Sequence, residues 1–467
     1  MKINPKIFKA YDIRGVYPKD INSDVAEKVT KGIHRFFSEA LGKRIYTVGI
    51  GRDMRVSSPE IYEGIKKVLK EYGLEIYDLG LVSTPAIYYA VLKFKLDGII
   101  QVTASHNPKE YNGLKFLIRK GKRLVKASGK FGIPKVKDYV LSESFLPFSG
   151  EKSKVIRKDR FDDVFVEDSL KYFGDFQVPK LKIVVDTANA LGILFLKPLL
   201  QRLGVEAIFI NEELDGTFPN HEADPLKPKN LRQLQEEVLK QKADLGIAPD
   251  GDGDRIFFVD EKGKIISPTR ITSLIARSIF KEKKGKKIVV DVRYVRNVKK
   301  IAEAFGGEVV LTRVGHAFIT EKVNEEKAFF AGESSGHYYF YDFGGGENSV
   351  LPVLYLLREL GREGKTVSDL ISSLSLVHES GEINFRIPEG KTSGQIFKLV
   401  EEKFSEGKVI KIDGLTVEFD NWRFNFRASN TEPLIRLNLE AEDKSILESK
   451  LKEILDYLAS LKVFPLK

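Results

Sequence analysis

Three aspartates alternate with glycines in the segment APDGDGDR, residues 248–255. It follows the apolar run ADLGI, which predicts a buried strand. Alternate residues of an extended backbone share a face, so Asp250, Asp252 and Asp254 project together, and the glycines let the chain curl until the carboxylates converge. Converging negative charges repel unless a cation lies between them, and oxygen ligands favour Mg²⁺ or Mn²⁺. The segment therefore predicts a metal site.

Other interpretations of the acidic segment fit less well. A solvated acidic turn stays open as the alternative that needs no metal. An EF-hand loop starting at Asp250 would find Glu261 at its twelfth position, but it needs Gly at the sixth, where Arg255 stands. A phosphatase of the haloacid-dehalogenase type would use the first aspartate of a DxDx(T/V) motif as its nucleophile. That motif needs Thr or Val at its last position, where this chain has Asp254.

Ser105 follows a second predicted buried strand, LDGIIQVTA, in the motif TASHNP. A phosphorylated serine carries about −1.5 to −2 charges and three acceptor oxygens, so it would suit a metal site far better than a free hydroxyl. We therefore interpret Ser105 as a phosphoryl carrier, with a capping hydroxyl as the alternative. A Ser-His-Asp hydrolase is disfavoured because no G-x-S-x-G elbow is present, and because His106 would not easily reach back to Ser105 in an extended backbone.

Two further polar stretches could bind a substrate. GESSGH, residues 332–337, offers a carboxylate, a hydroxyl and an imidazole in a predicted tight turn, which suits vicinal sugar hydroxyls. FRASNTEPLIR, residues 426–436, places an arginine beside Ser, Asn and Thr between two predicted strands, an arrangement that suits a phosphate. Either stretch alone is also typical of an ordinary turn.

Strand and helix patterns alternate along most of the chain. Residues 45–53 predict a strand, and 57–73 predict a helix with Ser58 as its cap. Similar α/β patterns restart near residues 181 and 286, and after about residue 375 the strands become amphipathic and antiparallel in character. We therefore expect an α/β protein with three related domains, built on mixed, mainly parallel sheets, and a C-terminal antiparallel α+β domain. The expected divisions are 1–150, 151–260, 261–375 and 376–467.

Composition narrows the functional classes. The chain has no Cys, which excludes disulfides and thiolate chemistry, and the N-terminus has no apolar signal segment, so we expect a cytoplasmic protein. No apolar run is long enough to span a membrane. The net charge of +10 is spread among acidic residues, which favours a small anionic substrate over nucleic acid. One segment, 119–137, is notably basic.

The sequence resembles the α-D-phosphohexomutase family over nearly its whole length, and most closely the phosphomannomutase/phosphoglucomutase branch of that family. The motifs that carry the resemblance are AYDIRG, GRDMR, TASHNPKEYNGLK, DGTFPNHEADPL, DGDGDR, TRVGH, GESSGH and RASNTEP. The resemblance implies three related α/β domains and a fourth domain around one central cleft.

The resemblance also implies roles for individual residues. Ser105 would carry the phosphoryl group and, with the three aspartates, bind Mg²⁺, while Lys115 would be the general acid/base, supported by Arg14 and His106. The expected substrate-binding residues are Arg255, Arg293, His316, Glu333, Ser335, His337, Arg427, Ser429, Asn430 and Thr431.

The implied reaction exchanges phosphate between C1 and C6 of glucose and mannose phosphates through a hexose 1,6-bisphosphate, which is also the activator. The alternatives are a phosphoglucosamine mutase and a non-catalytic phosphosugar-binding protein. His316 resembles the mannose/glucose branch. We expect no membrane or nucleic-acid partner, and either a monomer or a homodimer.

Overall fold

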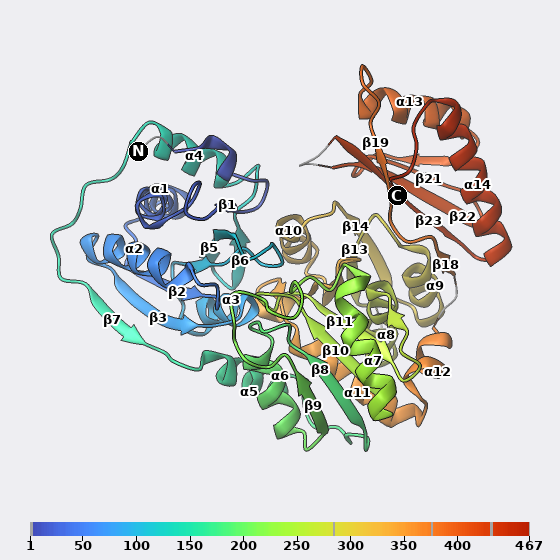
Figure 1. The fold of residues 1–467 in the computed structure, drawn as a ribbon, viewed down its shortest axis with the longest axis horizontal. Coiled ribbons are helices and arrows are strands. Elements are labelled where there is room, and N and C mark those ends of the chain that lie inside the picture. The colour runs from blue at the N-terminus through green and yellow to red at the C-terminus, as the bar shows by residue number, and fades with distance from the viewer. Residues whose placement is uncertain (1–2, 284, 375–376, 430–432, 467) are drawn as a thin grey trace.

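The computed structural model describes residues 3–283, 285–374, 377–429 and 433–466, and these residues form four β-sheets. Three sheets combine parallel and antiparallel strands, and the fourth is antiparallel throughout. The predicted fold class is therefore confirmed. Figure 1 shows the fourth sheet, with its helices, as a separate lobe at the C-terminal end.

The first sheet has the strand order β1-β5-β4-β2-β3-β7, with β6 paired to β5. Its strands are β1 (Ile13–Val16), β2 (Thr47–Arg52), β3 (Glu75–Leu81), β4 (Gly98–Val102), β5 (Tyr111–Lys120), β6 (Arg123–Lys126) and β7 (Lys154–Arg157). Its helices are η1 (Pro5–Ile7), α1 (Ser23–Leu41), α2 (Ser58–Glu71), α3 (Thr84–Lys93) and α4 (Ile133–Leu141), and α5 (Phe161–Phe173) follows β7 and contacts α3 and α6 (Ile193–Arg202). Because β7 pairs with β3, this strand belongs to the first sheet although it follows residue 150.

The predicted helix cap at Ser58 is wrong by one position. Helix α2 has Ser57 as its N-cap, and Ser58 is its first helical residue. The Ser58 hydroxyl instead donates to the carboxylate of Asp53, at the end of β2. Ser58 therefore helps to hold the chain where β2 leads into α2.

The second and third sheets have the orders β12-β11-β10-β8-β9 and β14-β13-β15-β16-β17. The second unit contains β8 (Lys182–Asp186), α6 (Ile193–Arg202), β9 (Glu206–Ile210), η2 (Pro228–Leu231), α7 (Arg232–Gln241), β10 (Leu245–Pro249), β11 (Ile256–Asp260) and β12 (Ile265–Ile266). The third contains α8 (Pro268–Glu282), β13 (Lys287–Asp291), α9 (Arg296–Phe305), β14 (Glu308–Thr312), α10 (His316–Glu326), β15 (Phe330–Gly332), β16 (Tyr338–Phe340), η3 (Tyr341–Phe343), β17 (Gly346–Glu347), α11 (Val350–Glu363) and α12 (Val367–Ser372).

The three α/β units share one feature that places the site. In each, a strand with a parallel neighbour is followed by a loop and an antiparallel partner: β4 and β5, β10 and β11, β15 and β16. The loops between these pairs contain TASHNP, DGDGD and ESSGH, respectively. The chemically distinctive motifs thus occupy the same position in three related units.

The C-terminal sheet has the order β18-β23-β22-β21-β20, with β19 paired to β23. Its elements are β18 (His378–Glu379), β19 (Ile383–Arg386), α13 (Ser393–Lys403), β20 (Lys408–Ile410), β21 (Leu415–Glu418), β22 (Trp422–Ala428), β23 (Leu434–Ala441) and α14 (Lys444–Ser460). The stretch RASNTEP joins β22 to β23.

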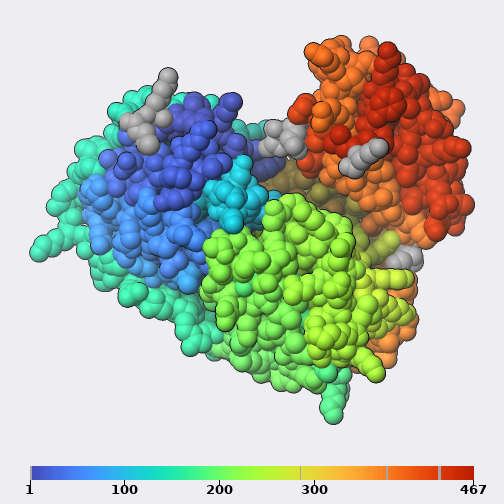
Figure 2. Space-filling view, viewed as in Figure 1, coloured from blue at the N-terminus to red at the C-terminus, as the bar shows by residue number. Residues whose placement is uncertain are grey.

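The hydrophobic core separates the C-terminal lobe from the three α/β units. One buried cluster runs through all three α/β units, joining for instance Leu79, Ile183 and Ile288, whereas the C-terminal lobe has its own cluster around Phe424. Figure 2 shows the surface hollowed between the N-terminal domain and this lobe. None of the described helices is long and apolar enough to cross a membrane.

Candidate active site

Ser105 lies buried just beyond the end of β4 with a left-handed backbone, at φ 50°. Its amide donates to Thr103 Oγ1 at 2.9 Å, and its hydroxyl donates to Asp250 Oδ2 at 2.9 Å. The hydroxyl also lies 3.2 Å from His106 Nδ1. The expectation that His106 would not easily reach back to Ser105 is therefore wrong, because the backbone at Ser105 is not extended.

Arg55 fixes the Ser105 loop and was not singled out from the sequence. Its fully buried guanidinium donates to the carbonyl oxygens of Ser105, Asn107, Pro108 and Tyr111, and its Nε lies 3.1 Å from Asp53 Oδ2. A planar five-donor group can hold several carbonyls at once in a way that a lysine cannot. The only sequence signal for Arg55 was its place in the motif GRDMR. Its partners are backbone carbonyls, which every residue has, so the sequence could not indicate them.

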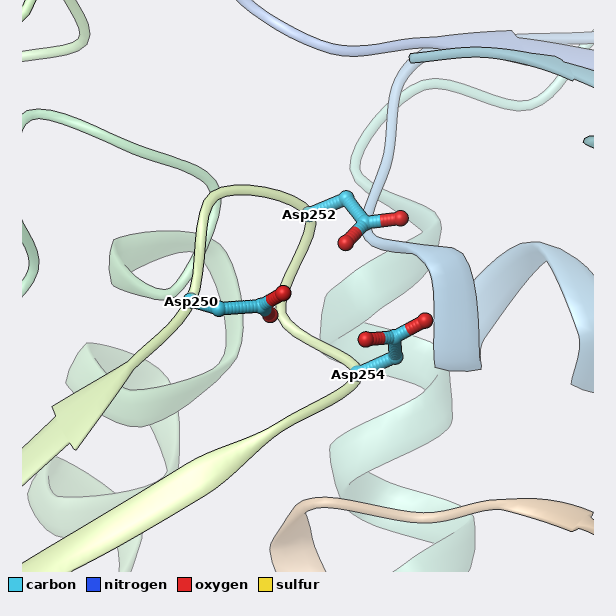
Figure 3. A group of neighbouring side chains, drawn as sticks. All are labelled: Asp250, Asp252 and Asp254. Carbon is cyan, nitrogen blue, oxygen red and sulfur yellow. The ribbon is translucent and has the colours of Figure 1, made fainter. Parts of the chain in front are cut away.

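The three aspartates of the second loop converge as predicted (Figure 3). Each offers one oxygen within 4.8 Å of the others, and all three side chains are buried. Gly251 brings this loop against Ser105, since a Cβ there would lie only 2.5 Å from the Ser105 carbonyl oxygen. The serine and the acidic cluster therefore form one site, although 145 residues separate Ser105 from Asp250.

Lys115, on β5, balances part of this negative charge. Its Nζ lies 2.6 Å from Asp252 Oδ2 and 2.7 Å from Asp254 Oδ2. Burial opposes the ammonium charge, but Asp252 and Asp254 outweigh it and hold the pKa of Lys115 well above its usual value. Burial, Asp254 and Asp252 raise the pKa of Asp250 to about 8. The cluster thus holds more negative charge than its own lysine neutralises.

The donor set fits a hard divalent cation. The ligands are carboxylate oxygens, the type that Mg²⁺ prefers. Asp252 Oδ1 is buried and has no hydrogen-bond partner among the described residues, and a buried carboxylate oxygen left unsatisfied is costly. Thr84 orients the same side chain by donating from its Oγ1 to Asp252 Oδ2 at 2.6 Å.

The third loop is joined to the acidic cluster by His337. Its Nε2 lies 3.1 Å from Asp254 Oδ1 and its Nδ1 lies 3.0 Å from Glu333 Oε2. Burial disfavours the charged imidazole, but Asp254 and Glu333 outweigh it and raise the pKa of His337 to about 9. Ser335 Oγ is 3.1 Å from the same Nδ1, and Tyr339, missed from the sequence, donates to Glu333 Oε2 at 3.0 Å.

Two predicted arginines also reach this region. Arg293 is buried, with its Nη2 3.3 Å from Glu333 Oε1 and its Nε 2.9 Å from Asp291 Oδ1. Arg255 donates its backbone N–H to Asp250 Oδ1 at 3.2 Å, and its Nε lies 3.3 Å from His337 Nε2. The structure therefore links the second and third loops through both charge and hydrogen bonds.

The remaining predicted residues lie around this centre. Arg14, on β1, donates to Asn107 of the serine loop and to Asp12. His316 begins α10 with its ring 5.3 Å from that of Tyr11, which donates to the Val314 carbonyl.

Arg427 lies near the end of β22 with its Nη2 3.8 Å from Glu382. Burial and the nearby Arg293 lower the pKa of Arg427, and its buried Nε has no partner among the described residues. The Ser429 amide donates to the Leu434 carbonyl at 2.8 Å, whereas Asn430 and Thr431 lie outside the described residues.

Substitution of Gly251 by alanine tests the closeness of the first two loops. We expect kcat to fall by about 10- to 100-fold, because an added Cβ must push the aspartates away from Ser105 and small displacements of reacting groups are costly. Gly394→Ala is the matched control, since its Cβ would meet nothing nearer than 4.0 Å. Steady-state kinetics of both variants give the comparison, and a Gly251→Ala enzyme within twofold of wild type would contradict this geometry.

Comparison with known proteins places this chain in a class. Four family models match it in order: phosphoglucomutase/phosphomannomutase alpha/beta/alpha domain I over residues 5–132, domain II over 164–263, domain III over 267–376, and the C-terminal domain over 382–456. The chain belongs to the phosphoglucomutase/phosphomannomutase family, whose members are isomerases acting as phosphohexomutases.

Individual relatives match over nearly their full length. A phosphomannomutase of Methanocaldococcus jannaschii is 38% identical over 97% of this chain and 98% of its own. A protein of Xanthomonas campestris described as "phosphohexose mutases" is 33% identical over 97% of this chain and 98% of its own. The crystal structure of a phosphoglucomutase/phosphomannomutase family protein from Burkholderia thailandensis superimposes with a TM-score of 0.87 at 31% identity, covering 98% of both chains.

Proposed function

We propose that this chain catalyses reversible phosphoryl transfer between C1 and C6 of hexose phosphates, with Ser105 as the carrier. The observation that supports this most is the contact of the Ser105 hydroxyl, at 2.9 Å, with an acidic cluster that also holds Lys115. In this proposal, domains 1–150, 151–260, 261–375 and 376–467 contribute the phosphoserine, metal, sugar and phosphate loops, respectively.

In the proposed first step, a sugar hydroxyl oxygen attacks the phosphorus of phosphorylated Ser105. The bond from phosphorus to Ser105 Oγ breaks and a hexose 1,6-bisphosphate forms, while Lys115 gives its proton to the leaving Oγ and takes the proton of the sugar hydroxyl. In the return step the Ser105 hydroxyl oxygen attacks the other phosphate, the bond from that phosphorus to the sugar oxygen breaks, and Lys115 protonates the sugar oxygen and takes the Ser105 proton. Mg²⁺ held by the three aspartates would offset negative charge on the transferred phosphoryl group. It would also offset the aspartate charges that raise the pKa of Lys115, so that Lys115 could release its proton. Arg14 and His106 support the loop that carries Ser105.

The third loop is proposed to bind the sugar hydroxyls. The carboxylate of Glu333 would accept a hydrogen bond from one sugar hydroxyl, and the hydroxyl of Ser335 would donate one to its neighbour. The contact of His337 with Glu333 would hold that carboxylate in place. Arg255, Arg293 and His316 would contact the sugar or its phosphates. The buried Nε of Arg427, which has no hydrogen-bond partner in the described part of the chain, supports a phosphate site that would also use Ser429, Asn430 and Thr431.

The bisphosphate must turn by about 180° between the two transfers, because one serine serves both ends of the sugar. The separate hydrophobic core of the C-terminal lobe supports a movement that would let the phosphate loop release and regrip the intermediate. A bisphosphate that escapes leaves Ser105 unphosphorylated, so catalytic amounts of glucose 1,6-bisphosphate should restore activity.

We expect activity on both glucose 1-phosphate and mannose 1-phosphate. These sugars differ only at C2, and a site that reads other hydroxyls through Glu333 and Ser335 loses little when C2 is inverted, whereas a site built to bond C2 would discriminate by about 10⁴-fold or more. A coupled assay with Mg²⁺ and the bisphosphate, comparing kcat/KM for glucose, mannose and glucosamine phosphates, tests this. A preference for glucosamine over both hexoses above ~10³ would instead assign a phosphoglucosamine mutase.

A further inference from the structure

Lys126 is a buried charge in the basic segment 119–137, and the proposed mutase mechanism does not use it. It is the last residue of β6, and its side chain is only 1% exposed. Its Nζ donates to both carboxylate oxygens of Glu347, on β17, whose side chain is also 1% exposed. Because β6 belongs to the first sheet and β17 to the third, this ion pair joins the domain that carries Ser105 to the domain that carries the third loop.

The stability of the fold does not by itself account for this ion pair. Burial lowers the pKa of Lys126, although Glu347 opposes the shift. The two segments are already held together by their backbones, since the Leu124 amide donates to the Gly344 carbonyl at 3.0 Å. Replacing a buried ion pair with apolar side chains of similar size is often neutral or stabilising. We therefore looked for the role of the pair in what Lys126 touches.

Two buried tyrosine rings flank the Lys126 ammonium. Its Nζ lies 5.2 Å from the ring centroid of Tyr339 and 4.9 Å from that of Tyr88. Tyr339 is also the strand partner of Glu347 where β16 pairs with β17. An ammonium over an aromatic face attracts the ring, and more strongly when both are removed from water. The ion pair therefore helps to hold Tyr339 through both its ring and its strand.

Tyr339 extends this contact to the third loop. Its hydroxyl donates to Glu333 Oε2 at 3.0 Å, and the same oxygen lies 3.0 Å from His337 Nδ1. A carboxylate that binds a ligand needs neighbours whose own positions are fixed. We propose that Lys126 is a positioning residue for hexose phosphate binding, which acts through Tyr339 on Glu333. This inference rests on the proposed role of Glu333 in binding the sugar.

The test replaces the ion pair as a whole, because removing Lys126 alone would leave a buried carboxylate without its partner and destabilise the fold. The Lys126→Met/Glu347→Met enzyme should melt no more than about 5 °C below wild type. Its Kd for glucose 1-phosphate, measured by calorimetry, should rise by about three- to tenfold. KM should rise with Kd while kcat changes by less than about threefold, as expected when ground state and transition state lose the same contact.

Two further measurements separate this role from a general disturbance of the site. The Mg²⁺ affinity of the Lys126→Met/Glu347→Met enzyme should stay within about twofold of wild type, because the three aspartates keep their contacts. Lys126→Gln/Glu347→Gln, which removes the charges and keeps a possible hydrogen bond, gives the same comparison should the methionine pair fail to fold. Lys122→Met is the matched control, because it removes an exposed lysine of the same segment, and it should change Kd by less than about twofold.

Tyr339→Phe tests whether Lys126 acts through the tyrosine hydroxyl. It removes the hydrogen bond to Glu333 and should raise the Kd for glucose 1-phosphate by about tenfold. Adding the Lys126→Met/Glu347→Met change to Tyr339→Phe should then raise Kd by less than about twofold, because residues that act in series are not additive.

The inference is overturned if replacing the ion pair leaves Kd unchanged while Tyr339→Phe raises it, if the two effects on Kd multiply in full, or if Mg²⁺ affinity falls as far as sugar affinity. A Tyr339→Phe enzyme with the wild-type Kd would overturn it together with the proposed role of Glu333. A wild-type enzyme without turnover would contradict the proposed mutase reaction, and the Kd series would still decide the role of Lys126.

Discussion

Ser105→Ala is expected to lower kcat for hexose 1-phosphate by at least about 10⁴-fold, because the carrier has no substitute and losses of this size follow removal of a covalent nucleophile. The Kd for the sugar phosphate should stay within a few-fold of wild type, since Arg427 and the third loop are untouched. Stopped assays with the bisphosphate activator measure kcat, and calorimetry measures binding.

The control for this variant is Ser169→Ala, which removes a buried hydroxyl that accepts a hydrogen bond from Asn348. It should keep ordinary turnover despite some loss of stability. If Ser105→Ala retained more than about a tenth of wild-type kcat while folded, the carrier assignment would be wrong.

Asp252→Asn is expected to weaken Mg²⁺ binding by at least about 100-fold, above the range found for residues that only support metal ligands. Activity at fixed Mg²⁺ should fall with it and partly recover at high Mg²⁺. The reason is structural: one oxygen of this carboxylate has no hydrogen-bond partner among the described residues, while the other contacts Lys115 and Thr84. Calorimetric Mg²⁺ titration and kcat at several Mg²⁺ concentrations provide the measurements.

Asp260→Asn is the matched control for the metal site. Asp260 is also buried and lies at the end of β11, but its carboxylate accepts backbone N–H groups of Lys262 and Lys264, and it does not belong to the cluster of Asp250, Asp252 and Asp254. The Mg²⁺ affinity of the Asp260→Asn enzyme should match that of the wild type. An Asp252→Asn enzyme that lost activity but titrated Mg²⁺ like wild type would show that the triad is not the metal site.

Much of the fold and of the candidate site could be predicted because the informative residues lie close together in the chain. The spacing of Asp250, Asp252 and Asp254 is a local property, and the structure brings these carboxylates together as that spacing indicates. The alternation of strands and helices likewise predicted three α/β units followed by an antiparallel sheet.

What escaped prediction depends on contacts between distant segments. Arg55 bonds carbonyl oxygens some fifty residues away, and carbonyls are present at every position, so nothing in the sequence marks the partners. His337 reaches Asp254 across 83 residues. The error about His106 had a different cause: the left-handed backbone of Ser105 is rare for a non-glycine residue, so the sequence favoured an extended backbone there.

The most direct test of the proposed reaction follows the phosphoryl group itself. Enzyme phosphorylated with ³²P on Ser105 is mixed with unlabelled glucose 1-phosphate in a single turnover, and the label is located by peptide mapping and by separating the sugar phosphates. We predict that label leaves the Ser105 peptide, appears on C6 of glucose 1,6-bisphosphate, and is retained in glucose 6-phosphate. Label that stayed on the protein while glucose 6-phosphate formed, or that appeared only as inorganic phosphate, would contradict transfer through Ser105.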